Sequence, residues 1–228
     1  MKYGVVLPSY IYAEFRIDST NYGMASLAET RNDENKPTLL FVLRPTHYTA
    51  RVNYELPGIK QEFNVETVID PEGVSGTEQT LAWGTQKLFD DGCDYVTWMG
   101  DDALFHPQWH MKLRELINAK PTAKGWSVYR SAYEQYHKTL GQENGYVLVS
   151  TLCGHGMTIS KEEWKEWGID WRQGVWALPG SDTLDLYHAT QRPGERWTTA
   201  ESWIEHTGRA GVHCSPSTPE WAVNFQKI

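Results

Sequence analysis

Cysteine is scarce in this sequence, with three among 228 residues. Cys93, Cys153 and Cys214 lie far apart, and no Cys-x-x-Cys pair occurs. A disulfide scaffold needs an even set of cysteines, and a zinc knuckle needs closely paired ones. Neither is indicated, and so few scattered thiols are typical of a reducing compartment.

Long hydrophobic runs are also missing. The first apolar segment, Tyr3 to Leu7, is much shorter than a signal-peptide core or a membrane-spanning helix. No later segment approaches the length of a span. We therefore expect a cytoplasmic protein without a membrane span.

Positive charge is in deficit, because 21 lysines and arginines face 29 aspartates and glutamates, for a formal net charge of −8. Such a balance gives no general attraction to nucleic acid or to anionic membranes. Aromatic residues are plentiful, with 11 tryptophans and 12 tyrosines. They indicate either an aromatic core or stacking surfaces for flat ligands such as sugars and bases.

Strand and helix patterns alternate through the first half of the chain. A continuous apolar run typical of a strand buried on both faces occurs at 3–7, further buried strands are predicted at 38–43 and 66–69, and a fourth stops at Asp101 and Asp102. Helices are predicted at 19–31, 75–89 and 108–117, the second with Ser75 and Glu78 in capping-box spacing. This order predicts an α/β fold with a mostly parallel sheet and helices on both faces.

The second half is less regular. Strands are predicted at 125–130 and 146–152, and a glycine-flanked turn at 153–157. A short helix capped by Ser160 is expected to stop at Gly168. A further helix is predicted at 182–189, 197–205 is compatible with a strand, and residues from 215 onward receive no assignment.

The adjacent carboxylates of Asp101 and Asp102 are the most informative feature. Two neighbouring like charges cost free energy unless a cation or hydrogen-bond donors offset them. Open α/β sheets bind ligands at the carboxyl ends of their strands. A hard divalent cation with a phosphate ligand explains the pair, whereas capping of the next helix or a solvated strand end is the alternative.

Five short motifs accompany this pair along the chain. They are Pro8-Ser9-Tyr10, Pro107-Gln108-Trp109, Gly154-His155-Gly156-Met157, Ser181-Asp182 and His206-Thr207-Gly208. In this order, over roughly residues 3–215, the chain resembles the GT-A glycosyltransferases, in particular the family 2-like group. The acidic motif of that family is of the DxD type, and here glycine occupies its first place and Asp102 its last. Ser181 stands where the base motif usually has glutamate.

The resemblance implies a Rossmann-like GT-A catalytic domain over 1–215, with a nucleotide-sugar-binding half at 1–120, an acceptor half at 121–215 and a tail at 216–228. It implies a metal-dependent, inverting glycosyltransferase that moves a sugar from a UDP- or GDP-sugar to a hydroxyl. The acceptor is a glycan, or a modified DNA base, and only in the latter case is nucleic acid a partner.

Site residues follow from the matched motifs. For Mn²⁺ or Mg²⁺ the expected ligands are Asp102, His206 and His213, although each histidine is as readily a structural one. Donor contacts are expected from Pro8, Ser9, Tyr10, Arg44, Asp70, Asp101 and Arg209. Acceptor contacts are expected from His155, Trp171, Trp176 and Trp203.

The acceptor hydroxyl must lose a proton, and a carboxylate is the usual base. Asp182 is the first candidate and Asp185, three residues on, the second. Asp182 is equally suited to cap the helix that it precedes, and the two roles are compatible.

Two other functions fit parts of the sequence. A nucleotidyltransferase would carry a loop rich in glycine and basic residues after the first strand, and this chain has Pro8 to Tyr12 there. A non-catalytic, aromatic-rich sugar-binding module is the other alternative. The presence of both Asp102 and Asp182 argues against it.

Overall fold

A large sheet forms the centre of the fold in the computed structural model, which describes residues 1–132, 137–173, 183–207, 222 and 224–225. Its nine strands follow the order β3-β2-β1-β4-β9-β6-β10-β8-β7. They are β1 (Tyr3–Ser9), β2 (Thr38–Leu43), β3 (Asn64–Ile69), β4 (Tyr95–Trp98), β6 (Gly125–Ser127), β7 (Thr139–Glu143), β8 (Tyr146–Val149), β9 (Met157–Ser160) and β10 (Arg196–Thr199). β5 (Ala103–Phe105) and β11 (Ile204–His206) form a separate two-stranded sheet.

Strand direction divides the large sheet into two halves. β3, β2, β1 and β4 run parallel, so their carboxyl ends meet at one edge. β9 runs antiparallel to both β4 and β6, and β8 and β7 complete the other side as antiparallel strands. The predicted α/β class, with a large and mostly parallel central sheet flanked by helices, is confirmed, and the antiparallel strands come from the second half of the chain.

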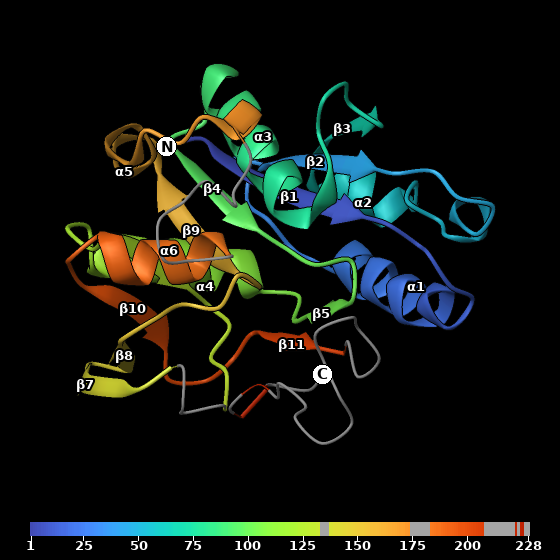
Figure 1. Ribbon diagram of the computed structural model, residues 1–228. Helices are drawn as coiled ribbons and strands as arrows, with labels where there is room; N and C mark the ends of the chain where they lie inside the picture. The colour runs from blue at the N-terminus through green and yellow to red at the C-terminus, as the bar shows by residue number, and fades with distance from the viewer. Residues whose placement is uncertain (133–136, 174–182, 208–221, 223, 226–228) are drawn as a thin grey trace.

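Helices cover both faces of the sheet (Figure 1). They are α1 (Phe15–Ala28), α2 (Pro57–Glu62), α3 (Gly76–Asp90), α4 (Trp109–Ala119), α5 (Lys161–Trp167) and α6 (Leu184–Gln191), with single turns of 3₁₀ helix at Thr49–Arg51 and Trp171–Gln173. Strand side chains alternate between the two faces. In β2, Phe41 packs in the layer with α1, α2 and α4, whereas its neighbour Leu40 packs in the layer with α3, α5 and α6.

Most helix and strand predictions hold, with shifted ends. The helix predicted from residue 19 begins at Phe15, because Ser19 is not a cap and its hydroxyl bonds back to the Arg16 carbonyl inside the helix. The strand predicted at 125–130 ends at Ser127, whose hydroxyl bonds both backbone groups of Tyr129. The segment 197–205 holds parts of two strands, β10 and β11.

The capping box predicted for α3 does not form. Gln79 accepts the backbone N–H and the hydroxyl of Ser75 instead, at 2.8 and 3.1 Å. The Glu78 carboxylate is turned away and accepts the backbone N–H of Leu184 at 2.8 Å. Glu78 therefore joins the first turn of α3 to the start of α6. The cap predicted at Ser160 is confirmed, as is the left-handed Gly168 that ends α5.

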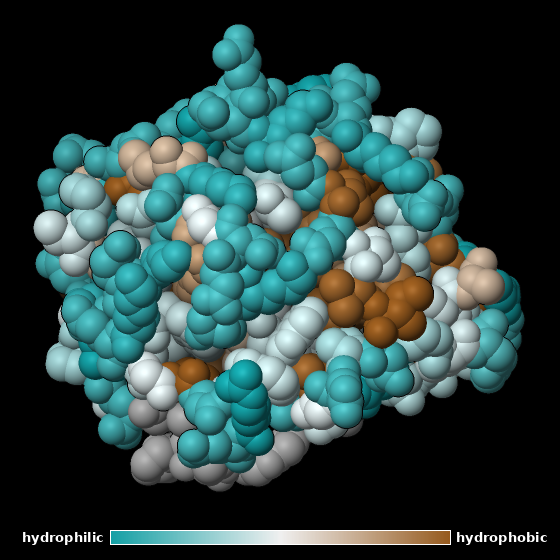
Figure 2. All heavy atoms as spheres, turned by 90° about the horizontal axis from the view of Figure 1, so that it is seen from above, coloured by the Kyte–Doolittle hydropathy of each residue, from teal (hydrophilic) through white to brown (hydrophobic). Residues whose placement is uncertain are grey.

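The surface seen from above is mostly hydrophilic, with hydrophobic side chains gathered in a few patches (Figure 2). The large aliphatic and aromatic side chains are mainly in the two layers against the sheet. Within the described residues, no helix combines the length and the apolar character needed to cross a membrane.

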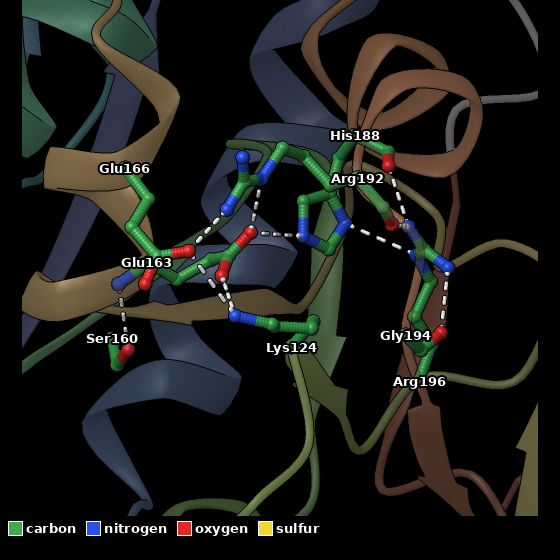
Figure 3. A network of polar contacts seen from close by, with 8 residues as sticks. All are labelled: Lys124, Ser160, Glu163, Glu166, His188, Arg192, Gly194 and Arg196. Atoms are coloured by element: carbon green, nitrogen blue, oxygen red, sulfur yellow. Dashed lines mark hydrogen bonds and ion pairs between the residues drawn. The ribbon is translucent and has the colours of Figure 1, made fainter.

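A buried polar cluster joins α5, α6 and β10 on the α3 side of the sheet (Figure 3). Glu163, only 3% exposed, pairs with Lys124 and Arg192 at 2.8 Å each. Arg196 donates to Nδ1 of the buried His188, so the neutral ring carries its proton on Nε2, which faces Glu163 at 3.6 Å. Although burial opposes it, these partners lower the pKa of Glu163 to about 2.

Replacing Glu163 by glutamine is expected to reduce the free energy of unfolding by about 2 kcal/mol, since it removes the charge of the buried carboxylate that pairs with Lys124 and Arg192. Because the folded pKa of Glu163 lies below its usual 4.5, its stabilisation is complete above pH 4.5 and is lost as the pH falls toward 2. In urea unfolding, the difference in free energy of unfolding between the wild type and Glu163→Gln should therefore shrink as the pH falls below 4.5.

Glu166→Gln is the matched control, because Glu166 contacts the same lysine and arginine from an exposed position. It should cost less than about 1 kcal/mol. If Glu163→Gln and Glu166→Gln lost the same free energy of unfolding at pH 7, Glu163 would not be the main stabilising carboxylate of the cluster.

Candidate functional site

Asp101 and Asp102 lie just beyond the end of β4 and are almost fully buried, at 4% and 6% exposure. Arg16, in the first turn of α1, compensates both charges. Its Nη1 donates to Asp102 Oδ2 at 2.7 Å, and its Nη2 donates to Asp101 Oδ1. The positive charge that offsets the two adjacent carboxylates therefore comes in part from a side chain 85 residues away in the sequence.

Close packing of α1 on the acidic turn brings Arg16 into place. A Cβ on Gly23 would lie 2.8 Å from the carbonyl oxygen of Ala103 and 3.0 Å from that of Asp101. Only glycine lets the helix backbone approach these carbonyls so closely. The glycine thus sets the distance between α1 and the acidic pair.

A chain of hydroxyls supports Asp101 from the other side. Ser9, the last residue of β1, donates to Asp101 Oδ2 at 2.5 Å, and its oxygen lies 2.7 Å from the Tyr54 hydroxyl. Burial raises the pKa of Tyr54 to about 12, so the phenol keeps its proton and donates to Ser9. Burial likewise raises the pKa of Asp101 to about 6, against the opposing influence of Arg16.

Pairing of β11 with β5 places His206 beside Asp102. His206 lies opposite Ala103 in the register, and Thr207 bonds the Asp102 carbonyl through both its N–H and its hydroxyl. The His206 Nε2 lies 3.3 Å from Asp102 Oδ2. Burial alone would raise the pKa of Asp102, but His206, with His155 and Arg16, holds it below the usual range.

His155 reaches the same point from the turn that precedes β9. The turn is fixed by Gly156, whose N–H bonds the Trp98 carbonyl at 2.7 Å, and by Gly154, whose N–H bonds Asp185 at 2.9 Å. The rings of His155 and His206 stack with centroids 4.0 Å apart.

One carboxylate and two imidazoles thus converge, with one ligand atom each from Asp102, His155 and His206 within 4.8 Å of one another. These are donor types that bind divalent metal ions. The residues present fit a metal ion by this donor set. They differ from the predicted set, because His155 was expected on the acceptor side and His213 lies outside the described residues.

A cavity of about 650 Å³ opens beside this trio, at the carboxyl ends of the parallel strands. Its volume is in the range of small-molecule sites. The predicted site residues that line it are Pro8, Ser9, Tyr10, Arg44, Asp70, Asp101, Asp102, His155 and His206. Arg44 and Asp70 follow neighbouring strands, with Nε and Oδ1 3.5 Å apart.

Other predicted residues are not among those that line the cavity. Trp203 packs edge-on against His106, and Trp171 lies beside Arg172. Asp185 belongs to the first turn of α6, where it holds the turn that carries His155. The predicted residues outside the described part of the chain are Asp182, Trp176, Arg209 and His213.

Three contributions to the site were not predicted from the sequence. Arg16 and Tyr54 were not considered, Arg16 lying outside the helix predicted at 19–31, and His155 was not paired with the acidic motif. The unbalanced charge of Asp101 and Asp102 signals that a cation is needed, but nothing local identifies which one. For His155, the signal available in the sequence is its place between two glycines.

No protein-family model and no curated protein sequence matches the chain. Among solved structures, it is similar to S. aureus TarS 1–349, at 11% identity and a TM-score of 0.59 over 92% of this chain. For the complex of TarS 1–349 with UDP-GlcNAc, these values are 14%, 0.60 and 93%. For the complex with UDP, they are 14%, 0.57 and 90%.

The matched part covers 60 to 61% of the TarS 1–349 chains, so this protein spans about three fifths of their length. The chain is also similar to A197 from STIV, at 10% identity and a TM-score of 0.52, over all of this chain and 98% of that one. At such identities the likeness shows the fold alone. The chain has a GT-A-like fold, with its candidate site at the edge where the parallel strands end.

Proposed function

We propose that this protein is a glycosyltransferase that moves a sugar from a nucleotide diphosphate donor to a hydroxyl acceptor. One observation carries the proposal: a buried carboxylate and two histidines come together in the lining of a 650 Å³ cavity, at the carboxyl ends of parallel strands. The complexes of TarS with UDP-GlcNAc and UDP support a nucleotide-sugar ligand for a chain of this fold.

The donor would bind across the strand ends, as a UDP- or GDP-sugar. In this proposal Tyr10, Arg44 and Asp70 contact the nucleoside, since they line the cavity and directly follow β1, β2 and β3. Arg209 is kept as a donor contact on the resemblance alone. Residues 1–120 form the donor half of a catalytic domain that extends to residue 215.

A Mn²⁺ or Mg²⁺ ion would be held by Asp102 with His206 and His155. When bound, such an ion stabilises the negative charge that gathers on the diphosphate leaving group. Arg16 holds Asp102 in place through a 2.7 Å hydrogen bond. Asp101 accepts hydrogen bonds from both Arg16 and Ser9 and so fixes the position of the arginine. The bonded side chains of Ser9, Asp101, Arg16 and Asp102 hold one another in fixed positions, and a diphosphate can be oriented beside them.

The acceptor half is proposed to supply the base. Asp182 would accept the proton of the attacking hydroxyl, in an inverting reaction. Asp185 orients the turn at Gly154 and His155 rather than contacting the acceptor. Trp176 is proposed to pack on the acceptor, which is a glycan or a modified DNA base.

UDP or GDP together with Mn²⁺ is expected to raise the melting temperature by about 5–10 °C, because ligand at a hundred times its Kd adds about 2.7 kcal/mol. Asp102→Asn should remove the metal-dependent part of this shift, since it deletes a charged ligand. A thermal-shift screen of nucleotides and nucleotide sugars, with Mn²⁺ or EDTA, measures both effects.

Asp90→Asn is the control, because Asp90 is an exposed aspartate at the end of α3. It should leave every shift unchanged. The proposal fails if no nucleotide or nucleotide sugar shifts the melting temperature. Glycans that raise it without nucleotide or metal would instead identify a sugar-binding module.

A further inference from the structure

His155 and Gly100 stand in a steric relation that bears on the choice of metal. A Cβ on Gly100 would lie 2.6 Å from His155 Cε1, 2.7 Å from His155 Nδ1 and 2.7 Å from Asp102 Oδ1. Real Cβ atoms do not approach other atoms so closely. Any residue other than glycine at position 100 would therefore require the imidazole and the carboxylate to move.

Position 100 is the first place of the acidic motif, where the resemblance has an acidic residue. In this chain the space beside that position is taken by the ring of His155. The absence of the first acid and the presence of the imidazole are thus two aspects of one arrangement. Two of the potential ligand atoms, His155 Nδ1 and Asp102 Oδ1, both lie 2.7 Å from the point that the Cβ would occupy.

We infer that His155 replaces the missing first acid of the motif as a metal ligand, and that the site consequently selects a first-row transition-metal ion over Mg²⁺. This inference rests on the proposed function only in placing a divalent cation at Asp102. Its ligand set is one carboxylate and two imidazoles, the latter from His155 and His206.

The chemistry of these donors sets the preference. Mg²⁺ takes oxygen ligands in near-octahedral geometry and keeps several waters, so two imidazoles suit it poorly. First-row transition metals accept imidazole nitrogen, with affinity rising from Mn²⁺ through Co²⁺ for a given set of ligands. Two-histidine, one-carboxylate sets also leave coordination positions open for a further ligand.

The fixed backbone on both sides supports the role of His155. Its turn is bonded to β4 through Gly156 and to α6 through Gly154, and its ring stacks on His206. A ligand held this firmly loses little freedom on binding a metal. His155 is therefore held in position for ligation and is not a mobile surface histidine.

Titration calorimetry with metal alone, without nucleotide, tests the inference. The wild-type protein should bind Co²⁺ more tightly than Mn²⁺, and a large excess of Mg²⁺ should displace neither. His155→Asn should weaken Co²⁺ binding at least about tenfold and change the visible spectrum of the bound Co²⁺. His47→Asn, at an exposed histidine whose ring is tilted against that of Tyr48, is the control that should change neither.

A paired variant distinguishes ligand exchange from damage to the fold. Gly100→Asp combined with His155→Gly returns an acid to the first place and removes the imidazole from the space beside it, so that only the end of the Asp102 side chain has to shift. This protein should bind Mg²⁺ more tightly than the wild type does and should lose the preference for Co²⁺, a gain that misfolding does not produce.

Wild-type Co²⁺ affinity and an unchanged Co²⁺ spectrum in His155→Asn would overturn the inference, as would ready displacement of Co²⁺ by Mg²⁺ in the wild type. Because no nucleotide is present, these outcomes are separate from failure of the proposed function. That failure would appear as absent nucleotide binding in a protein that still binds Co²⁺ through His155.

Discussion

Asp182→Asn is expected to lower the turnover number by about 10²–10⁴ while the affinity for the nucleotide sugar stays the same. Asparagine keeps the size of the side chain but accepts no proton at neutral pH. The attacking hydroxyl then has no group to receive its proton as the new bond forms. Release of nucleotide diphosphate from the donor identified by thermal shift measures turnover, and calorimetry with the same donor measures affinity.

Asp185→Asn provides the comparison, because Asp185 already accepts the Gly154 N–H at 2.9 Å. The asparagine oxygen can keep that bond, so turnover should fall much less than in Asp182→Asn. The reverse order of effects would transfer the role of base to Asp185. Full activity in both variants would show that neither Asp182 nor Asp185 is the base.

The centre of the parallel half of the sheet was predictable from the sequence because β1 and β2 are nearly continuous apolar runs. Tyr3 to Leu7 and Thr38 to Leu43 are buried on both faces, and short apolar runs of this length, bounded by turn residues, are typical of buried strands. The carboxyl ends of parallel strands lie at one edge, so the sequence predicts Arg44, Asp70 and Asp102 at that edge, and all three line the cavity.

Residues joined across the chain could not be predicted in the same way. Arg16 meets Asp101 because Gly23 lets α1 lie against the acidic turn, and this packing leaves no periodic mark in the sequence. His206 meets Asp102 because β11 pairs with β5, two strands of three residues each. Elements this short give too little pattern to identify.

The structure also changes the meaning of the glycine at the first place of the acidic motif. From the sequence, Gly100 is a departure that weakens the motif. In the folded chain, the missing side chain of Gly100 leaves space for the ring of His155, which is the proposed ligand in place of the acid. A substitution that looks like a loss in one segment is thus matched by a side chain 55 residues away.

Arg16→Met is expected to reduce the free energy of unfolding by about 3–5 kcal/mol in metal-free buffer. Methionine preserves much of the apolar stem but leaves Asp101 and Asp102 buried without their shared cation. At this chain length, the loss corresponds to a fall in melting temperature on the order of 6–20 °C. Urea unfolding and thermal scans in EDTA measure both quantities.

Added Co²⁺ should restore part of the lost stability, because a cation bound at Asp102 stabilises the folded state by mass action. Arg51→Met is the matched control, since Arg51 pairs with Glu14 on the surface and should contribute less than about 1 kcal/mol. If Arg16→Met unfolds like the wild type in EDTA, the acidic pair does not need this arginine for its burial. If it is destabilised but Co²⁺ gives no recovery, the metal does not bind at the acidic pair, and the site must be sought elsewhere in the chain.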